Sequence, residues 1–404
     1  MGEPRDAAAP ESLDLAAPIS IDTEPDREAE HEGKQRDEPE KGIALCLSGG
    51  GYRASLFHTG ALWRLNESGY LPQVDRVSSV SGGSITAAVL AQAWPRLGFD
   101  HRGVAKAFES EVVGPLRRLT STTIDVGAIF WGLLTPGSIN SKLARRYRKL
   151  LFGDATLQDL PADGDGPRFV INAVNIGSGA LWRFSRPYMA DWKIGLVETP
   201  RVLLADAVAA SSAFPPVLSP ATLHVNQASY TEGSRTWPLA HLQAYGKVYL
   251  SDGGVYDNLG LETAWKRHRT ILVSDGGGQI TAEPTAKPDW ARHTIRVLQV
   301  VDNQVRSLRK RQLIASFKRR EREGAYWGIR SHVADYELPD PLLVCTATAE
   351  RLAAIKTRLR KMSHQDQEEL INWGYAISDT GLRRWVDPTL ARPASVPYPG
   401  SPIS

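Results

Sequence analysis

The sequence predicts an α/β protein built around a mainly parallel β-sheet. The first observation is a strand, a glycine turn and a helix that occur twice in succession between residues 42 and 94. The second is that two later apolar runs, 247–254 and 270–277, each lead into an Asp-Gly-Gly turn. Strands that alternate with helices in this way pair in parallel and are joined by right-handed crossovers.

Each element of the first unit follows from a local pattern. Residues 42–48, GIALCLS, form a short apolar run that ends in glycines, which is typical of a buried strand. Residues 54–68 carry apolar side chains at helical spacing, and Gly69 ends that helix. Residues 74–80 repeat the strand pattern, and residues 84–94 form a helix of mostly small residues.

The same patterns continue along the chain. The expected strands are 168–176, 247–254, 270–277 and 295–303, and the expected helices are 201–213, 305–322, 349–361 and 366–386. The helix at 305–322 is strongly basic. We therefore expect four regions, which are a disordered acidic tail (1–41), the main α/β domain (42–302), a helical C-terminal extension packed on that domain (303–390) and a loose tail (391–404).

The composition excludes several classes of protein. The chain has 404 residues, of which 42% are hydrophobic and 23% charged, as in an ordinary globular protein. Its two cysteines, Cys46 and Cys345, belong to no metal-binding or disulfide pattern, which favours a reduced, cytoplasmic protein. The N-terminus has no secretory pattern, and no apolar run is long enough to span a membrane.

The charge is unevenly distributed along the chain. Residues 1–40 contain 13 acidic and 4 basic residues, whereas the rest of the chain contains 32 acidic and 44 basic ones. The acidic tail has few large apolar residues and is expected to be disordered. The basic remainder can favour an anionic surface such as phospholipid headgroups or nucleic acid, although scattered surface charge on a soluble protein is the simpler explanation.

Ser81 lies in the sequence Ser-Val-Ser-Gly-Gly at 79–83, between an expected strand and an expected helix. A nucleophile elbow is written Gly-x-Ser-x-Gly, because the turn is so tight that the residues two positions away must be small. Ser79 replaces the first glycine, which weakens the pattern, and an ordinary strand-to-helix turn is the alternative. The flanking strand and helix make Ser81 a candidate nucleophile at a helix N-terminus, where backbone amides favour developing negative charge.

A glycine-rich loop, SGGGYRA at 48–54, follows the first strand. For acyl transfer, the unobstructed amides of Gly50 and Gly51, with Arg53 nearby, could form an oxyanion hole. The same loop also fits the dinucleotide-binding fingerprint Gly-x-Gly-x-x-Ala. That fingerprint needs an acidic residue that ends the next strand, and the only nearby acid, Asp75, begins it.

A serine nucleophile needs a general base. Asp252 and Asp275 each end an apolar strand, and Asp252 is favoured because Asn258 is available to bond its turn. A carboxylate is a weak base unless burial raises its pKa, so a Ser–Asp pair should be partly buried. An Asp-Gly pair is more often a simple turn. Four histidines come late enough to serve as the base instead, but none follows a clear apolar strand: His268, His293, His332 and His364.

Three motifs, taken together in this order, resemble those of the patatin-like phospholipase family. They are GGGYR at 49–53, SVSGG at 79–83 and DGGVYDN at 252–258. Residues 205–220, ADAVAASSAFPPVLSP, are similar to a further block of that family, and 169–185 resembles the strand and turn that precede this block. The resemblance covers roughly residues 42–262, and 303–386 looks like a C-terminal extension found on bacterial members.

The resemblance implies a three-layer α/β fold with helices on both faces of the sheet, and a serine lipid acyl hydrolase of the phospholipase A type. Ser81 would be the nucleophile, Asp252 the base, and Gly50 and Gly51 the oxyanion hole, assisted by Arg53. It implies no metal or other cofactor, and a phospholipid or other acyl lipid as substrate rather than a nucleic acid. A non-catalytic lipid-binding protein that retains the fold is the alternative.

Two segments are candidates for contact with a peripheral membrane surface. The basic helix at 305–322 could lie among headgroups through Arg319, Arg320 and Arg322. It could equally pack on the sheet with a solvated basic face. The apolar segment AIFWGLL, residues 128–134, could contact lipid, cover the site as a lid or belong to the core.

Overall fold

The computed structural model describes residues 39–124, 139–231, 245–278, 280 and 289–404. In these ranges, ten strands form one sheet: β1 (Glu40–Leu47), β2 (Val74–Val80), β3 (Arg168–Asn175), β4 (Leu181–Phe184), β5 (Tyr188–Asp191), β6 (Gly195–Glu198), β7 (Ala221–His224), β8 (Lys247–Asp252), β9 (His268–Asp275) and β10 (Glu323–Gly328). The strand order is β10-β9-β1-β2-β3-β4-β5-β6, and β8 pairs with both β3 and β7.

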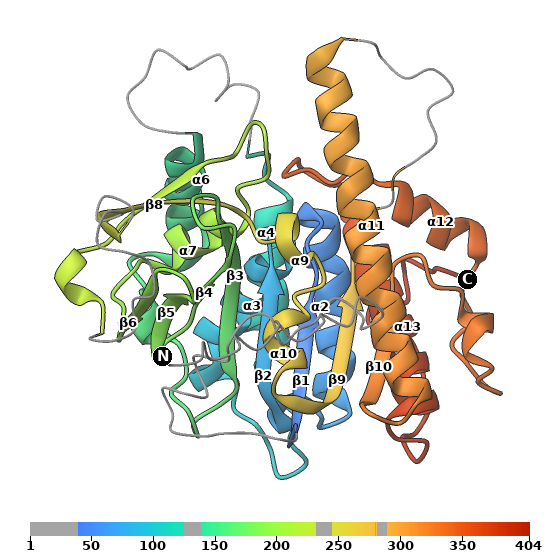
Figure 1. Ribbon diagram of the computed structural model, residues 1–404. Helices are drawn as coiled ribbons and strands as arrows, with labels where there is room; N and C mark the ends of the chain where they lie inside the picture. The colour runs from blue at the N-terminus through green and yellow to red at the C-terminus, as the bar shows by residue number, and fades with distance from the viewer. Residues whose placement is uncertain (1–38, 125–138, 232–244, 279, 281–288) are drawn as a thin grey trace, which may run out of the picture.

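Helices cover both faces of this sheet (Figure 1). They are α2 (Gly51–Glu67), α3 (Gly82–Ala93), α4 (Gly114–Thr120), α6 (Ile139–Tyr147), α7 (Leu204–Ser211), α9 (Gly254–Asp257), α10 (Glu262–Trp265), α11 (Trp290–Lys318), α12 (Thr346–Ala354) and α13 (His364–Trp385). Short 3-10 and π-helical turns connect several of them. Among the described helices, no segment is both long and apolar enough to cross a membrane.

The centre of the sheet is parallel. β10, β9, β1, β2 and β3 run in one direction, and Leu47 at the end of β1 pairs with Ser79 of β2 and Ser274 of β9. The remaining pairs, from β3 outward through β4, β5 and β6 and through β8 and β7, are antiparallel. The predicted α/β class is therefore confirmed, and the loops that follow β1, β2 and β9 meet at one edge of the sheet.

The residues of β1 divide between two apolar cores, because successive side chains of a strand point to opposite faces. Leu45 and Leu47 pack into the larger core with α2, α3 and α13, whereas Ala44 and Cys46 pack into a smaller one that includes Leu313 of α11. Because helices cover both faces of the central sheet, the fold has three layers. Burial of β1 on both faces also explains why GIALCLS is a continuous apolar run.

The expected strand at 295–303 is wrong. These residues form the first half of α11, whose N-terminus is capped where the Asp289 side chain accepts a hydrogen bond from the Arg292 amide at 3.0 Å. A short apolar run such as IRVLQVV does not distinguish a strand from a helix by its periodicity. The boundary expected at residue 303 consequently falls inside one helix. The sequence did not predict the short strands β4 to β7, nor β10, which extends the sheet beside β9.

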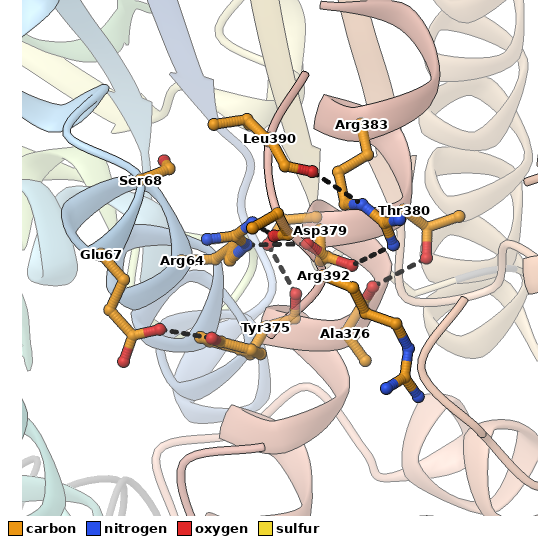
Figure 2. Close-up of polar contacts among 12 residues, drawn as sticks. Arg64, Glu67, Ser68, Tyr375, Ala376, Asp379, Thr380, Arg383, Leu390 and Arg392 are labelled. Carbon is orange, nitrogen blue, oxygen red and sulfur yellow. Dashed lines mark hydrogen bonds and ion pairs between the residues drawn. The ribbon is translucent and has the colours of Figure 1, made fainter. Parts of the chain in front are cut away.

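The C-terminal part of the chain is packed closely on α2 through α13. Gly60 and Gly374 permit the approach, since a Cβ at either position would lie 1.9 Å from a backbone oxygen of the other helix. Buried ion pairs reinforce it, with Arg64 of α2 2.8 Å from Asp379 of α13 (Figure 2). Because α2 begins at the glycine-rich loop, this packing fixes one side of the candidate site.

The final residues, which we expected to be loose, have no regular secondary structure but are tied to α13. The Asn372 side chain donates to the carbonyls of Tyr398 and Ser401, at 2.8 Å each. Ile403 is only 2% exposed. Residues 1–38 of the expected acidic tail and the apolar segment 128–134 lie outside the described residues.

Candidate active site

Ser81 occupies a strained turn between β2 and α3. Its φ of 51° and ψ of −116° lie in a region that residues other than glycine rarely adopt. The glycines that follow are required by close packing, because a Cβ at Gly82 would lie 2.3 Å from the Gly51 carbonyl oxygen. At Gly83 a Cβ would lie 2.2 Å from the Leu47 carbonyl oxygen. This is the geometry of a nucleophile elbow.

Ser79 fits where the elbow pattern usually has glycine. It lies within β2 and is not among the described residues that have a positive φ. Its hydroxyl donates to the Val170 carbonyl at 3.2 Å and accepts a hydrogen bond from the Ser84 hydroxyl at 3.1 Å. The position therefore needs a small side chain but not the backbone freedom of glycine.

Ser211, the last residue of α7, holds the backbone of the Ser81 turn through hydrogen bonds. Its Oγ accepts a hydrogen bond from the Ser81 amide at 3.0 Å and donates to the Asn172 carbonyl at 2.6 Å. The sequence reasoning singled out the block that contains Ser211 but gave this residue no role. The position of Ser211 in the block ADAVAASSA was the available signal in the sequence. Its contact with the Ser81 turn is a tertiary contact that the block alone does not show.

Asp252 ends β8 and is brought to Ser81 by the register of the sheet. It lies opposite Ala173 of β3, and the preceding residue, Asn172, pairs with Val80 at the end of β2. The Ser81 side chain lies close enough to the Asp252 carboxyl to lower its pKa by hydrogen bonding. The carboxylate accepts a hydrogen bond from the Gly254 amide at 2.7 Å. The structure therefore places the nucleophile and base proposed from sequence next to each other.

The electrostatic setting of Asp252 suits a general base. Complete burial raises the pKa of its carboxyl to about 7, although the hydrogen bonds from Gly254 and Ser81 oppose this rise. The nearby carboxyl of Asp302, on α11, raises the pKa further. A carboxylate whose pKa lies near neutral pH accepts a proton more readily than an ordinary aspartate.

Asp275, the competing aspartate, has a different environment. Its carboxylate accepts hydrogen bonds from the Tyr326 hydroxyl at 2.8 Å and the Gly277 amide at 2.9 Å. Burial alone would raise its pKa, but Arg306, these hydrogen bonds and Lys310 hold the pKa below its ordinary value. Asp275 is thus a stable anion in a charged cluster.

The glycine-rich loop lies beside Ser81, where a Cβ at Gly49 would come within 3.2 Å of the serine Cβ. Gly50 and Gly51 have φ of 147° and 61°, and a Cβ at Gly50 would lie 2.7 Å from the Gly276 carbonyl oxygen. Within the described ranges, neither amide of Gly50 or Gly51 has a hydrogen-bond partner. The loop starts a 17-residue helix with no acidic residue in its first turn, so these amides are suited to an oxyanion.

Arg53 is placed differently from the two glycines. Its buried guanidinium donates to the Gly276 carbonyl at 3.0 and 3.2 Å, to the carbonyls of Ala353 and Ile355, and to the Thr357 hydroxyl at 3.1 Å. Burial and Arg330 lower its pKa to about 10, which leaves it charged at neutral pH. These contacts fit a residue that positions the loop rather than one that binds the oxyanion directly.

Replacing Arg53 with glutamine should therefore loosen the loop that it holds. Carbonyl groups that lose a charged donor leave the protein less stable by about 3 kcal/mol. Hydrogen exchange of residues 355–362 should accelerate, together with a lower thermal midpoint. Arg330→Gln is the control, because the hydrogen bond described for the Arg330 guanidinium goes to Ala353 in α12, at 3.2 Å, and not to residues 355–362. Equal exchange in both variants would contradict this role of Arg53.

The dinucleotide interpretation of the loop does not fit this structure. Asp75, the acid that it would require, lies near the start of β2 and accepts a hydrogen bond from the Ile43 amide at 2.8 Å. The glycines lie at the other end of these parallel strands, after β1. No cluster of three or more potential metal ligands is found among the described residues either.

A serine on a strained elbow, next to a buried carboxylate and close to two open amides, has the parts of a serine hydrolase site on an α/β sheet. The sequence profile of the patatin-like phospholipases matches residues 45–265. The chain therefore belongs to the patatin-like phospholipase family. A comparison with curated protein sequences gives no match.

Solved structures share the fold at low sequence identity. Human GIVD cytosolic phospholipase A2 aligns with a TM-score of 0.50 and 14% identity, over 87% of this chain and 60% of that one. Its complex with methyl gamma-linolenyl fluorophosphonate aligns with a TM-score of 0.47, 14% identity and the same coverage. VipD from Legionella pneumophila gives a TM-score of 0.33 and 16% identity, over 84% of this chain and 66% of that one. The chain thus spans about three fifths of the length of the phospholipase A2.

Proposed function

We propose that the protein is a serine lipid acyl hydrolase of the phospholipase A type. The observation that carries this proposal is the strained turn at Ser81 beside Asp252, a buried carboxyl whose pKa is raised to about 7. Family membership supports an acyl lipid as the substrate. A non-catalytic lipid-binding protein would have no need of a strained serine beside a buried base.

In the first half of the reaction, Ser81 Oγ attacks the carbonyl carbon of the acyl ester while its proton passes to Asp252. The amides of Gly50 and Gly51 stabilise the negative charge that develops on the carbonyl oxygen. When the tetrahedral intermediate collapses, Asp252 returns the proton to the departing alcohol oxygen. The alcohol leaves as a lyso-lipid, and the acyl group remains on Ser81.

In the second half, a water molecule attacks the acyl-enzyme and gives its proton to Asp252. Collapse of this second intermediate breaks the bond to Ser81 Oγ, which recovers the proton, and the fatty acid is released. One carboxylate thus performs every proton transfer, which requires a pKa close to the working pH. Ser211 and Arg53 touch no reacting atom in this scheme and act by positioning the turn and the loop.

The proposal is tested with a panel of phospholipids and neutral acyl lipids presented to the wild type and to Ser81→Ala. We expect the wild type to release free fatty acid and lyso-lipid in equal amounts from at least one lipid, and the variant to release neither. Lipid binding by the wild type without any release would instead support the non-catalytic alternative. The readout is mass spectrometry of both products.

A further inference from the structure

Residues 355–362, which we call the strap, connect α12 to α13 and lie across the glycine-rich loop. The Arg358 carbonyl accepts a hydrogen bond from the Tyr52 amide at 3.2 Å, one residue beyond the candidate oxyanion hole. The Leu359 carbonyl accepts another from Ile124 at 3.0 Å, and the Met362 amide donates to Thr120 at 2.9 Å. The C-terminal part of the chain thus forms part of the border of the site.

The strap has an apolar inner side and a basic outer side. Leu359 is buried, whereas the four basic side chains of the sequence KTRLRK are exposed, namely Lys356, Arg358, Arg360 and Lys361. Within the described parts of the chain, none of these four side chains has an ion-pair or hydrogen-bond partner. Elsewhere on the surface such side chains are often paired, as Arg351 is with Asp366 at 2.8 Å. Four free cations within six residues form a concentrated positive surface.

Exposed apolar side chains lie at the same edge of the sheet. The first half of α11 rises beyond α9 and the ends of the central strands (Figure 1). Its Val297, Leu298, Val300 and Val301 are between 44% and 53% exposed, and Trp290 at its start is 83% exposed. A helix end that projects from the protein with apolar side chains on several sides is typical of a surface that meets another apolar phase.

Two further apolar side chains follow directly after groups that bond Asp252. Phe214 comes after Ala213, whose carbonyl accepts the Asp252 amide at 2.9 Å, and is 45% exposed. Val255 comes after Gly254, whose amide donates to the carboxylate, and is 47% exposed. The apolar surface therefore continues from α11 to the rim of the site.

We propose that this edge docks on an anionic lipid surface, with the strap cations on the phosphates of the headgroups and the first half of α11 among the acyl chains. The proposal rests on the proposed lipid substrate and specifies the surface on which that substrate is met. Charge complementarity selects the partner, since unpaired basic side chains next to apolar ones match anionic headgroups above a hydrocarbon layer. This docking brings Ser81 to face the lipid.

The basic residues first considered for membrane contact lie elsewhere. Arg319, Arg320 and Arg322 follow the C-terminal end of α11, where the chain turns into the start of β10 and hence at the edge of the sheet opposite Ser81. Arg319 is paired with Glu321 at 2.6 Å, and Arg322 donates to the Trp265 carbonyl at 3.1 Å. Lys318, the last residue of α11, and the next two residues, Arg319 and Arg320, are exposed at this opposite edge and provide a matched control.

The test measures co-sedimentation with vesicles of phosphatidylcholine alone or mixed with phosphatidylglycerol. All proteins carry Ser81→Ala, so that the lipid is not consumed. Lys356→Gln/Arg358→Gln/Arg360→Gln should weaken binding to the anionic vesicles on the order of 100-fold, since each cation near such a surface contributes about fivefold. Lys318→Gln/Arg319→Gln/Arg320→Gln removes the same charge from the opposite edge and should bind like the parent. Circular dichroism melting verifies that each variant is folded.

Equal loss of binding in both triple variants, or none in the strap variant, would overturn the docking surface. Binding that is insensitive to phosphatidylglycerol would do the same. Because the assay uses an inactive serine variant, its outcome is independent of hydrolysis. If wild-type protein released no fatty acid but the strap still governed vesicle binding, the docking surface would stand and the proposed reaction would fail.

Discussion

Ser81→Ala should abolish lipid hydrolysis, with turnover lower by about 10⁴-fold or more, because the covalent route has no other nucleophile. Steady-state release of fatty acid from the best lipid of the panel measures the effect. Ser79→Gly is the matched control on the same turn. It restores the residue usual in an elbow and removes only the hydrogen bonds with Val170 and Ser84, so most of the turnover should remain. Comparable loss in both variants would show that the turn, and not the Ser81 hydroxyl, is what the substitution damages.

The backbone strain at Ser81 also predicts how a substitution there changes the free energy of unfolding. A residue other than glycine at φ 51°, ψ −116° costs the fold of order 1–3 kcal/mol, and glycine adopts these angles freely. Ser81→Gly should therefore be inactive yet more stable than the wild type by about 1 kcal/mol in urea unfolding. An inactive variant that is also less stable would argue against strain stored at this turn.

Asp252→Asn should also abolish turnover, since an amide cannot accept the proton of Ser81. Its effect on stability should be opposite in sign to that of most buried substitutions. The native carboxyl has a pKa of about 7 instead of the usual 3.8, so the folded protein binds this proton more tightly than the unfolded chain does. The stabilisation that the protonated Asp252 carboxyl gives the folded state is fully present below about pH 4 and is lost progressively as the pH rises to about 7. At about 1.4 kcal/mol per pH unit, the loss is up to about 4 kcal/mol.

Asparagine does not ionise, so Asp252→Asn does not lose this stability as the pH rises. The variant should match the wild type in unfolding free energy near pH 4 and exceed it increasingly up to pH 7, above which the difference is constant. The same pKa predicts that kcat/KM of the wild type rises as pH increases through about 7, when Asp252 ionises. A wild-type profile that is flat between pH 6 and 8, or a variant that is less stable at pH 8, would contradict this assignment of the base.

Asp275→Asn is the matching substitution at the competing aspartate. It leaves Ser81 and Asp252 unchanged but removes the anion that faces Arg306 and Lys310. Removing one partner of a buried charge cluster costs about 3–5 kcal/mol. This variant should therefore keep its activity at low temperature and unfold earlier. The two aspartates, both at the end of a strand and before Gly-Gly, are thus expected to respond in opposite ways.

The sequence was sufficient for the parts of the fold that depend on local pattern. The short apolar runs before the glycine turns predicted β1, β2, β8 and β9, and the elbow serine followed from its flanking strand and helix. The structure brings Asp252 near Ser81 because β8 pairs with β3 and β3 with β2. That pairing order cannot be predicted from either strand alone, so the choice over Asp275 depended on Asn258 after the turn and on the family resemblance.

Features that depend on distant contacts were missed. The apolar run at 295–303 suits either a strand or a helix, and only the helix continues into the basic segment that follows it. β10 has a Gly at each of two positions and no β-branched residue, so its local pattern gave little indication of a strand. Arg53 sits next to the oxyanion loop in sequence, but its partners are more than 200 residues away.

Reaction with a fluorophosphonate probe tests the central claim most directly. Intact wild-type protein, supplied with lipid vesicles, should gain the mass of one phosphonyl group, and peptide mapping should place it on Ser81. Ser81→Ala should gain no mass, and Asp252→Asn should react far more slowly than Asp275→Asn. An adduct on another serine that persists in Ser81→Ala, or no adduct on folded, vesicle-bound wild type, would contradict the assignment of Ser81 as a nucleophile activated by Asp252.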